Sequence, residues 1–184
     1  HWMIEHAGTH ASKFDSKYST FPDLLEKAGY WVGYTGKGWG PGNYADGGFK
    51  RNPAGPGFSS KKKKSPIKGI SSTDYAANFN DFLEQRPDDK PFCFWLGGHE
   101  PHRVFEKGVG LKQGKKLGDV EVPGFLPDTP EIRSDILDYY VEIEWFDSHL
   151  AKALKQLEEL GELDNTLVIV TSDNGMAFPR AKAN

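Results

Sequence analysis

Three short apolar runs alternate along the chain with segments of helical periodicity. Residues 30–35 and 92–96 form two of these runs, and residues 166–171 form the third, a continuous Thr-Leu-Val-Ile-Val-Thr stretch. Apolar, β-branched runs of this length are typical of strands that are covered on both faces of a sheet. Because such strands alternate here with helices, the sequence predicts an α/β protein with a mostly parallel central sheet flanked by helices.

Helix start and stop residues mark three helical segments. Thr20 can cap a first helix, and Ser72 or Thr73 can cap a second. Thr129 can cap a long third helix that ends before Gly161. The apolar residues of this third helix recur at helical spacing: Ile132, Ile136, Tyr139, Ile143, Phe146, Leu150, Leu154 and Leu157. We expect this stripe to face the core, because an amphipathic helix buries its apolar side.

The composition fits one domain and excludes several classes of partner. The chain has 184 residues, 37% of them hydrophobic, which is enough to bury a sizeable core. Its formal net charge of -3 gives no global field that would attract nucleic acid or an anionic membrane surface. No apolar stretch approaches the roughly 20 residues of a membrane-spanning helix. Cys93 is the only cysteine and has apolar neighbours, so we expect a buried, inert thiol.

Each predicted strand runs directly into a loop with residues that can bind or react. Lys37 follows the first strand, His99 and His102 follow the second, and the pair Asp173 and Asn174 follows the third. The carboxyl ends of parallel strands share one edge of a sheet, where ligands bind in open α/β folds. We therefore expect these loops to meet, although each motif taken alone is also compatible with an ordinary surface turn.

The residue types in these loops fit the hydrolysis of an anionic ester or amide. Lysine offers a compact positive charge to an anion, and histidine can donate a hydrogen bond or transfer a proton. An Asp-Asn pair offers hard oxygen ligands that suit calcium or magnesium. Zinc is disfavoured, because two histidines separated by two residues, with no third ligand in evidence, make a poor zinc signature.

Four segments in a fixed order carry a resemblance to a known family. They are residues 24–30 leading to Gly36-Lys37, residues 98–103 (Gly-His-Glu-Pro-His-Arg), residues 127–130 (Pro-Asp-Thr-Pro), and residues 165–175 followed by Phe178-Pro179. With these segments the chain resembles the sulfatase family, and within it the heparan N-sulfatases, over nearly its whole length. The resemblance implies a fold like that of alkaline phosphatase and a formylglycine nucleophile, made from Cys or Ser in a C/S-x-P-x-R motif.

The resemblance also implies roles for individual residues. Asp173 and Asn174 would be calcium ligands, Lys37 would bind the sulfate group, and His102 would contact the sulfuryl group or help proton transfer. A basic residue shortly after the Asp-Asn pair usually completes such sites.

The basic residue that completes the site would be Lys182, with Arg180 as the alternative. His99 and Arg103 would help to shape the substrate pocket.

The chain departs from the family pattern in two places. Trp39 stands where many sulfatases have a histidine, two residues after the site lysine. No C/S-x-P-x-R motif occurs anywhere in the sequence. We therefore expect residues 1–184 to be the central part of a single catalytic domain, without the upstream nucleophile segment and the C-terminal remainder. We also expect these residues to be inactive on their own.

The expected function is that of a calcium-dependent sulfatase of glycosaminoglycan sugars, with N-sulfoglucosamine of heparan type as the favoured substrate. By the same resemblance the expected location is extracytoplasmic, whereas the oligomeric state stays open. Two alternatives remain. One is a phosphoester or phosphonate hydrolase of the same superfamily. The other is a non-catalytic module that binds sulfated glycans through the lysine run at residues 61–64 and through aromatic residues.

Overall fold

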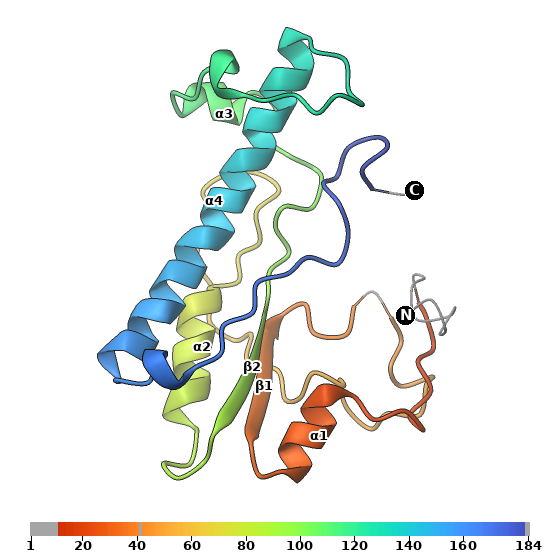
Figure 1. Cartoon of the computed structure of the whole chain (residues 1–184), viewed down its shortest axis with the longest axis vertical. Coiled ribbons are helices and arrows are strands. Elements are labelled where there is room, and N and C mark those ends of the chain that lie inside the picture. Colours follow the sequence, from red (N-terminus) through yellow and green to blue (C-terminus); the bar gives the residue numbers. More distant parts are fainter. Residues whose placement is uncertain (1–10, 41, 183–184) are drawn as a thin grey trace. The chain divides into compact units, whose positions relative to one another are not determined.

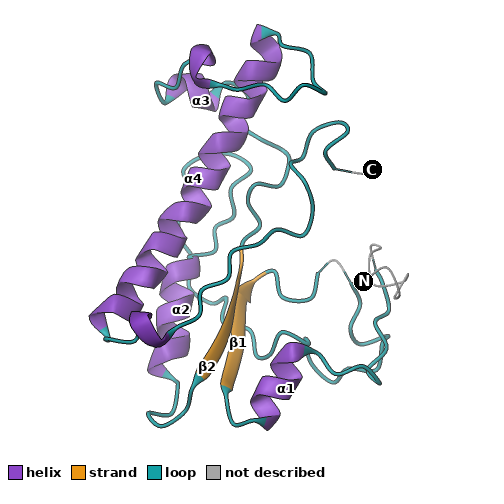
Figure 2. Cartoon of the chain, in the orientation of Figure 1, coloured by secondary structure: helices purple, strands orange, loops and turns teal. Residues whose placement is uncertain are grey.

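The computed structural model describes residues 11–40 and 42–182 of the chain (Figure 1). Its elements follow in the order α1 (Phe21–Lys27), β1 (Trp31–Gly36), α2 (Tyr75–Glu84), β2 (Phe92–Gly97), α3 (Val109–Lys112), η2 (Leu117–Asp119), α4 (Pro130–Glu159) and η3 (Leu163–Asn165). A small parallel sheet with helices beside it confirms the α/β class (Figure 2). No helix in the described part of the chain is long and apolar enough to cross a membrane.

The chain divides into two compact units, and the first contains both strands. It consists of the described residues up to 62 together with residues 73–98. β1 and β2 pair in parallel, and the register runs from Trp31 opposite Phe92 to Gly36 opposite Gly97. Parallel neighbours need a long crossover connection, and α2 lies within the connection here. The strands predicted at residues 30–35 and 92–96 are thus confirmed.

Aromatic side chains form the core of the first unit. Phe82 of α2 is fully buried, and its ring centroid lies 4.6 Å from that of Phe94 and 5.3 Å from that of Phe58. A Cβ atom on Gly33 of β1 would lie 2.8 Å from the Phe82 ring. Glycine at this position therefore lets α2 pack closely on the sheet, where close aromatic pairs add to the stabilisation from burial.

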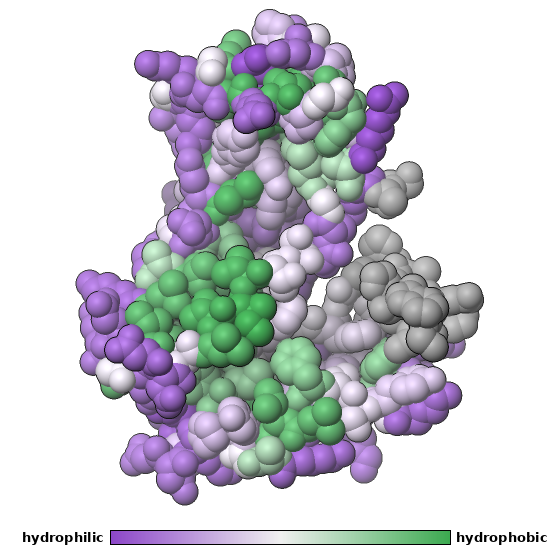
Figure 3. Space-filling model, in the orientation of Figure 1, coloured by the Kyte–Doolittle hydropathy of each residue, from purple (hydrophilic) through white to green (hydrophobic). Residues whose placement is uncertain are grey.

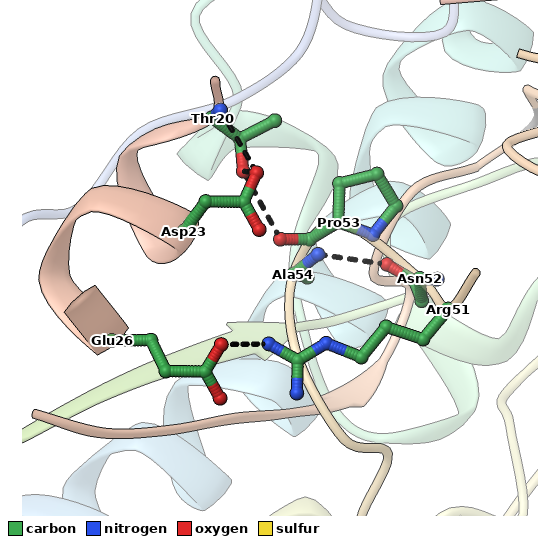
Figure 4. A network of polar contacts seen from close by, with 7 residues as sticks. All are labelled: Thr20, Asp23, Glu26, Arg51, Asn52, Pro53 and Ala54. Carbon is green, nitrogen blue, oxygen red and sulfur yellow. Dashed lines mark hydrogen bonds and ion pairs between the residues drawn. The ribbon is translucent and has the colours of Figure 1, made fainter. Parts of the chain in front are cut away.

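α1 is fixed at both ends by polar contacts (Figure 4). At its start, the Thr20 backbone N–H donates to the Asp23 carboxylate at 3.1 Å, as in a capping box. The Thr20 hydroxyl lies 2.8 Å from the same carboxylate and 3.3 Å from the Pro53 carbonyl oxygen. Near the end of the helix, Arg51 forms an ion pair with Glu26. The loop that contains residues 51–53 is thereby held against α1.

The second unit is organised around the long helix α4. This unit consists of residues 63–72 together with the described residues from 99 onward. Thr129 caps α4 as predicted and accepts a hydrogen bond from the Ile132 backbone at 3.4 Å. One cluster of buried hydrophobic residues in this unit consists of Phe105, Val120, Ile136, Leu137 and Phe178.

The face of α4 that is buried differs from the predicted apolar stripe. Ile136 and Leu157 are buried as expected, whereas Ile143 is 39% exposed. Asp138 and Glu142 are buried instead. The Asp138 carboxylate accepts hydrogen bonds from two backbone N–H groups at the start of α3, at 2.7 and 2.8 Å. A buried carboxylate is tolerated when backbone donors replace its water, and hydrophobic periodicity alone does not reveal such donors.

The strand predicted at residues 166–171 is absent, and this prediction is wrong. The segment has no regular secondary structure and pairs with no strand among the described residues. Leu167 is 85% exposed and Ile169 is 75% exposed. Figures 1 and 3 show the chain in the same orientation. Where Figure 1 draws this segment, Figure 3 shows hydrophobic residues at the surface. A strand depends on neighbouring strands for its hydrogen bonds, so an apolar run alone does not make one.

Candidate active site

Lys37 begins the loop that follows β1, and its backbone is fixed to the end of β2. Its N–H donates to the Gly97 carbonyl at 2.7 Å. The Trp95 indole N–H donates to the Lys37 carbonyl at 2.8 Å. Both strands therefore end side by side, so that the lysine loop and the chain leading to His99 leave the sheet at its carboxyl edge.

Glycine is required where these two loops leave the sheet. Gly36 has a φ of +67°, and a Cβ atom there would lie 2.1 Å from the Gly97 carbonyl oxygen. A Cβ atom on Gly97 would lie 1.8 Å from the Lys37 carbonyl oxygen. We expect Gly97→Ala to lower the free energy of unfolding by about 3 kcal/mol, because the lysine loop must move to relieve the overlap.

Denaturant unfolding of Gly97→Ala beside Gly118→Ala measures this effect. A Cβ atom on Gly118 meets nothing within 4 Å, so that variant should stay within about 0.5 kcal/mol of the parent. Equal stabilities of the two variants would contradict the close approach of the two loops.

Trp39, which replaces the histidine expected at this position, is packed into the first unit. Its ring centroid lies 5.1 Å from that of Phe14. Its backbone N–H donates to the Asn52 side-chain oxygen at 3.0 Å. The same oxygen accepts from the Ala54 backbone N–H at 2.9 Å (Figure 4). Trp39 and Asn52 thus fix the shape of the lysine loop.

In the second unit, the loop of residues 99–103 exposes both of its histidines. His102 Nδ1 lies 2.5 Å from the Arg103 carbonyl oxygen. A carbonyl oxygen only accepts, so Nδ1 carries the proton in this contact. In the neutral ring Nε2 is then the nitrogen that can accept a proton, and in the charged ring it is the nitrogen that can donate one.

The Asp173-Asn174 pair lies in an exposed bend shortly after residues 166–171. The Ser172 hydroxyl donates to the Asn174 carbonyl at 2.9 Å, and a Cβ atom on Gly175 would lie 2.3 Å from the Ala181 carbonyl oxygen. The bend is therefore tight. The described residues contain no cluster of three or more His, Cys, Asp or Glu side chains that could hold a metal. Asp173 and Asn174 fit calcium chemically, but they supply only part of the six to eight oxygens that calcium takes.

The remaining predicted residues also belong to the second unit. Lys182 is half-buried, and its backbone N–H donates to the Phe178 carbonyl at 3.2 Å. Arg180 Nη1 donates to the Phe125 carbonyl oxygen at 3.4 Å. Arg103 pairs with Asp135 of α4. Of the predicted site residues, Lys37 alone belongs to the first unit. That Lys37 shares a cleft with the other site residues stays a prediction.

The histidine loop and α4 each contribute one carboxyl group to a buried pair that was not predicted from the sequence. Glu100 is 7% exposed and accepts a hydrogen bond from the Ser71 backbone at 2.7 Å. Glu142 is 1% exposed, and within the described chain neither of its carboxyl oxygens has a hydrogen-bond partner. Burial and the negative charge of Glu100 raise the pKa of Glu142 to about 7. The sequence offered one signal for this pair: Glu142 follows Asp138 by one helical turn, so both acidic residues lie on the same face of α4.

All of these loops lie within a region that matches a known family. A sequence model of the sulfatase family matches residues 3–183. The chain therefore belongs to the sulfatase family, which is part of the alkaline-phosphatase-like superfamily.

Individual relatives agree with this assignment. N-sulphoglucosamine sulphohydrolase of Homo sapiens is 34% identical over 121 residues, which cover 54% of this chain and 24% of that protein. An ulvan-active sulfatase of Formosa agariphila is 34% identical over 61 residues, covering 33% of this chain and 10% of that enzyme. The multifunctional alkaline phosphatase superfamily protein PehA of Trinickia caryophylli is 24% identical over 155 residues, covering 65% of this chain and 30% of that protein. The chain thus spans less than a third of the length of each of these relatives.

Proposed function

We propose that residues 1–184 are the central part of a sulfatase catalytic domain, and that the whole protein removes sulfate groups from glycosaminoglycan sugars. The family match over residues 3–183 carries this proposal. The similarity to a human enzyme named for N-sulphoglucosamine favours an N-sulfated glucosamine of heparan type as the substrate. We further propose an extracytoplasmic location for the whole protein, and its family membership supports this location.

Lys37 and His102 have the central roles in this proposal. The Lys37 ammonium group binds the sulfate oxygens, and the two hydrogen bonds to its backbone support this role because they fix where the side chain starts. His102 exchanges a proton through Nε2 with the leaving amine or alcohol. His99 and Lys182 contact the sulfated sugar.

The proposed chemistry also needs two groups that are not side chains of this sequence. A formylglycine from a segment outside this sequence would supply the nucleophile. Asp173 and Asn174 would hold part of a calcium site, and the ion would supply positive charge near the anionic sulfate oxygens. The hard oxygen donors of these two residues fit that ion.

A phosphoester or phosphonate hydrolase is the second candidate, because the PehA protein is also similar to this chain. Lysine and a divalent cation bind sulfate and phosphate by the same chemistry. Turnover of a sulfated aryl ester and of the matching phosphate ester by the whole protein separates the two. We expect kcat/KM to be higher for the sulfate ester. A preference for the phosphate ester would replace the proposed function with the second candidate.

A glycan-binding module is supported less well. Two ammonium groups of the lysine run already have partners within the protein. That of Lys61 lies 3.8 Å from the Asp81 carboxylate, and that of Lys63 lies 5.4 Å from the centre of the Trp145 ring. Heparin binding that survives loss of Lys37 and His102 but fails without the lysine run would favour this alternative.

We expect residues 1–184, purified alone, to show no sulfatase activity. The only cysteine is half-buried in β2, its sequence context lacks the formylglycine motif, and burial raises the pKa of its thiol. The measurement is an assay on N-sulfated glucosamine and a sulfated aryl ester, with Cys93→Ala as the control variant. Turnover that disappears in Cys93→Ala would contradict the account and assign the nucleophile to this thiol.

A further inference from the structure

The guanidinium group of Arg103 forms hydrogen bonds with two distant residues of the second unit, Asp135 and Ala177. Its Nε–H donates to the Ala177 carbonyl at 2.8 Å. Its Nη1 donates to one carboxylate oxygen of Asp135 at 3.1 Å, and its Nη2 donates to the other. Paired N–H donors on one carboxylate give an arginine both strength and a fixed orientation.

Two buried rings also contact this guanidinium group. Its central carbon lies 4.5 Å from the Phe105 ring centroid and 4.7 Å from the Phe178 ring centroid. Phe105 is 6% exposed and Phe178 is 3% exposed, and both belong to the core of the second unit. Cation–π contacts at this distance add to the hydrogen bonds. The guanidinium group is therefore held by α4, by its own loop and by the segment that includes residues 177 and 178.

The contacts of Arg103 join the two motifs of the second unit. Arg103 directly follows His102, and Ala177 lies four residues after Asp173. We infer that Arg103 is a positioning residue that fixes the His102 loop and the segment after the Asp173-Asn174 pair to the same helix. The effect of Arg103 on catalysis rests on the proposed function. Its effect on the order of residues 173–181 does not. This role takes the place of the substrate contact that the motif suggested.

Asp135 separates the positioning role from a substrate contact. If Arg103 binds substrate, Arg103→Lys raises KM and Asp135→Asn has little effect. If Arg103 positions the two motifs, Asp135→Asn reproduces most of the loss seen in Arg103→Lys. The double variant is then scarcely worse than the more damaging single variant, because both changes remove one interaction.

Asp128→Asn is a matched control on the neighbouring ion pair. Arg133 of α4 also donates to both oxygens of one carboxylate, that of Asp128, at 2.5 and 2.7 Å. Its Nη1 donates to the carbonyls of Leu117 and Val120 at 2.8 Å, which belong to neither motif. The control therefore loses a similar ion pair without touching the segment after Asp173.

The experiment measures backbone hydrogen exchange at residues 173–181 and the kinetics on a sulfated substrate, in the whole protein. Asp135→Asn and Arg103→Lys should each increase exchange in this segment about 10-fold and lower kcat about 10-fold, as loss of a supporting contact at a site typically does. KM should change much less than kcat. Asp128→Asn should leave both readouts at the parent values.

Exchange at parental rates in Asp135→Asn would overturn the inference, whatever the kinetics show. A raised KM confined to Arg103→Lys would overturn it as well and would restore the substrate contact. If the parent protein turns over no sulfated substrate, the proposed function fails while the exchange measurement still decides the positioning role.

Discussion

Lys37→Ala and His102→Ala are each expected to lower kcat/KM about 100-fold or more on a sulfated substrate in the whole protein. Loss of a group that stabilises developing charge or transfers a proton typically has this effect. The backbone contacts of Lys37 persist in the alanine variant, because they involve its N–H and carbonyl groups alone. Thermal stability should therefore change little, and the loss should appear in turnover.

Lys90→Ala is a suitable control for this prediction, because Lys90 is exposed and lies before β2, at the opposite end of the strand from the candidate site. It should leave kcat/KM unchanged. Kinetics of Lys37→Ala or His102→Ala that match those of Lys90→Ala would remove that residue from the mechanism.

Glu142 is expected to make the protein less stable as the pH rises from 5 to 8. Its pKa is raised from an ordinary value of 4.5 to about 7, by burial first and by Glu100 second. Below pH 4.5 the group is neutral in the folded and unfolded states alike. Between pH 4.5 and 7 only the unfolded state releases the proton, so the free energy of unfolding falls as the pH rises. The full loss above pH 7 is about 3 kcal/mol, since one pKa unit corresponds to about 1.4 kcal/mol.

The surroundings of Glu142 make this effect separable from other titrations. Asp138 and His149 are further buried titratable groups of α4, and Glu100 faces Glu142 from the histidine loop. The carboxyl groups whose pKa is lowered, such as those of Glu106 and Asp128, are ionised in both states above pH 5. The difference between the parent and Glu142→Gln therefore isolates the Glu142 titration.

Denaturant unfolding of the parent and Glu142→Gln at pH 5 and pH 8 gives the measurement. Glu142→Gln should gain about 2.5 kcal/mol relative to the parent between the two pH values, because part of the full loss has already occurred at pH 5. Glu158→Gln, at an exposed position of the same helix, should gain nothing. Parallel pH profiles of the parent and Glu142→Gln would contradict the burial of an uncompensated carboxyl group.

Local signals in the sequence were sufficient for most helix ends and for two strands. The Thr20 and Thr129 caps lie where the sequence predicts them, because a cap depends on residues within one helical turn. α2 begins after Asp74, whose carboxylate accepts from the Ala77 N–H at 3.1 Å, and not after Ser72 or Thr73 as predicted. Neighbouring polar residues compete for the capping position, so the sequence leaves an uncertainty of one or two residues.

Features that depend on distant partners could not be predicted. The run at residues 166–171 has the composition of a strand, but strand pairing is set by other parts of a chain. The motif around Arg103 indicated a site, but its partners Asp135 and Ala177 lie 32 and 74 residues away in the sequence. The position of Lys37 at the end of a strand followed directly from the apolar run before it.

The central claim is that Lys37, His102, Asp173 and Asn174 build one sulfate site. The most direct measurement is a crystal structure of the whole protein with calcium and a sulfated sugar bound. The account predicts that all four side chains lie within about 15 Å of one another around the sulfate group, the size of a small-ligand pocket. Calcium should contact Asp173 and Asn174 at about 2.3–2.6 Å. Side chains on opposite faces of the protein, or a sulfate group bound far from Lys37, would contradict it.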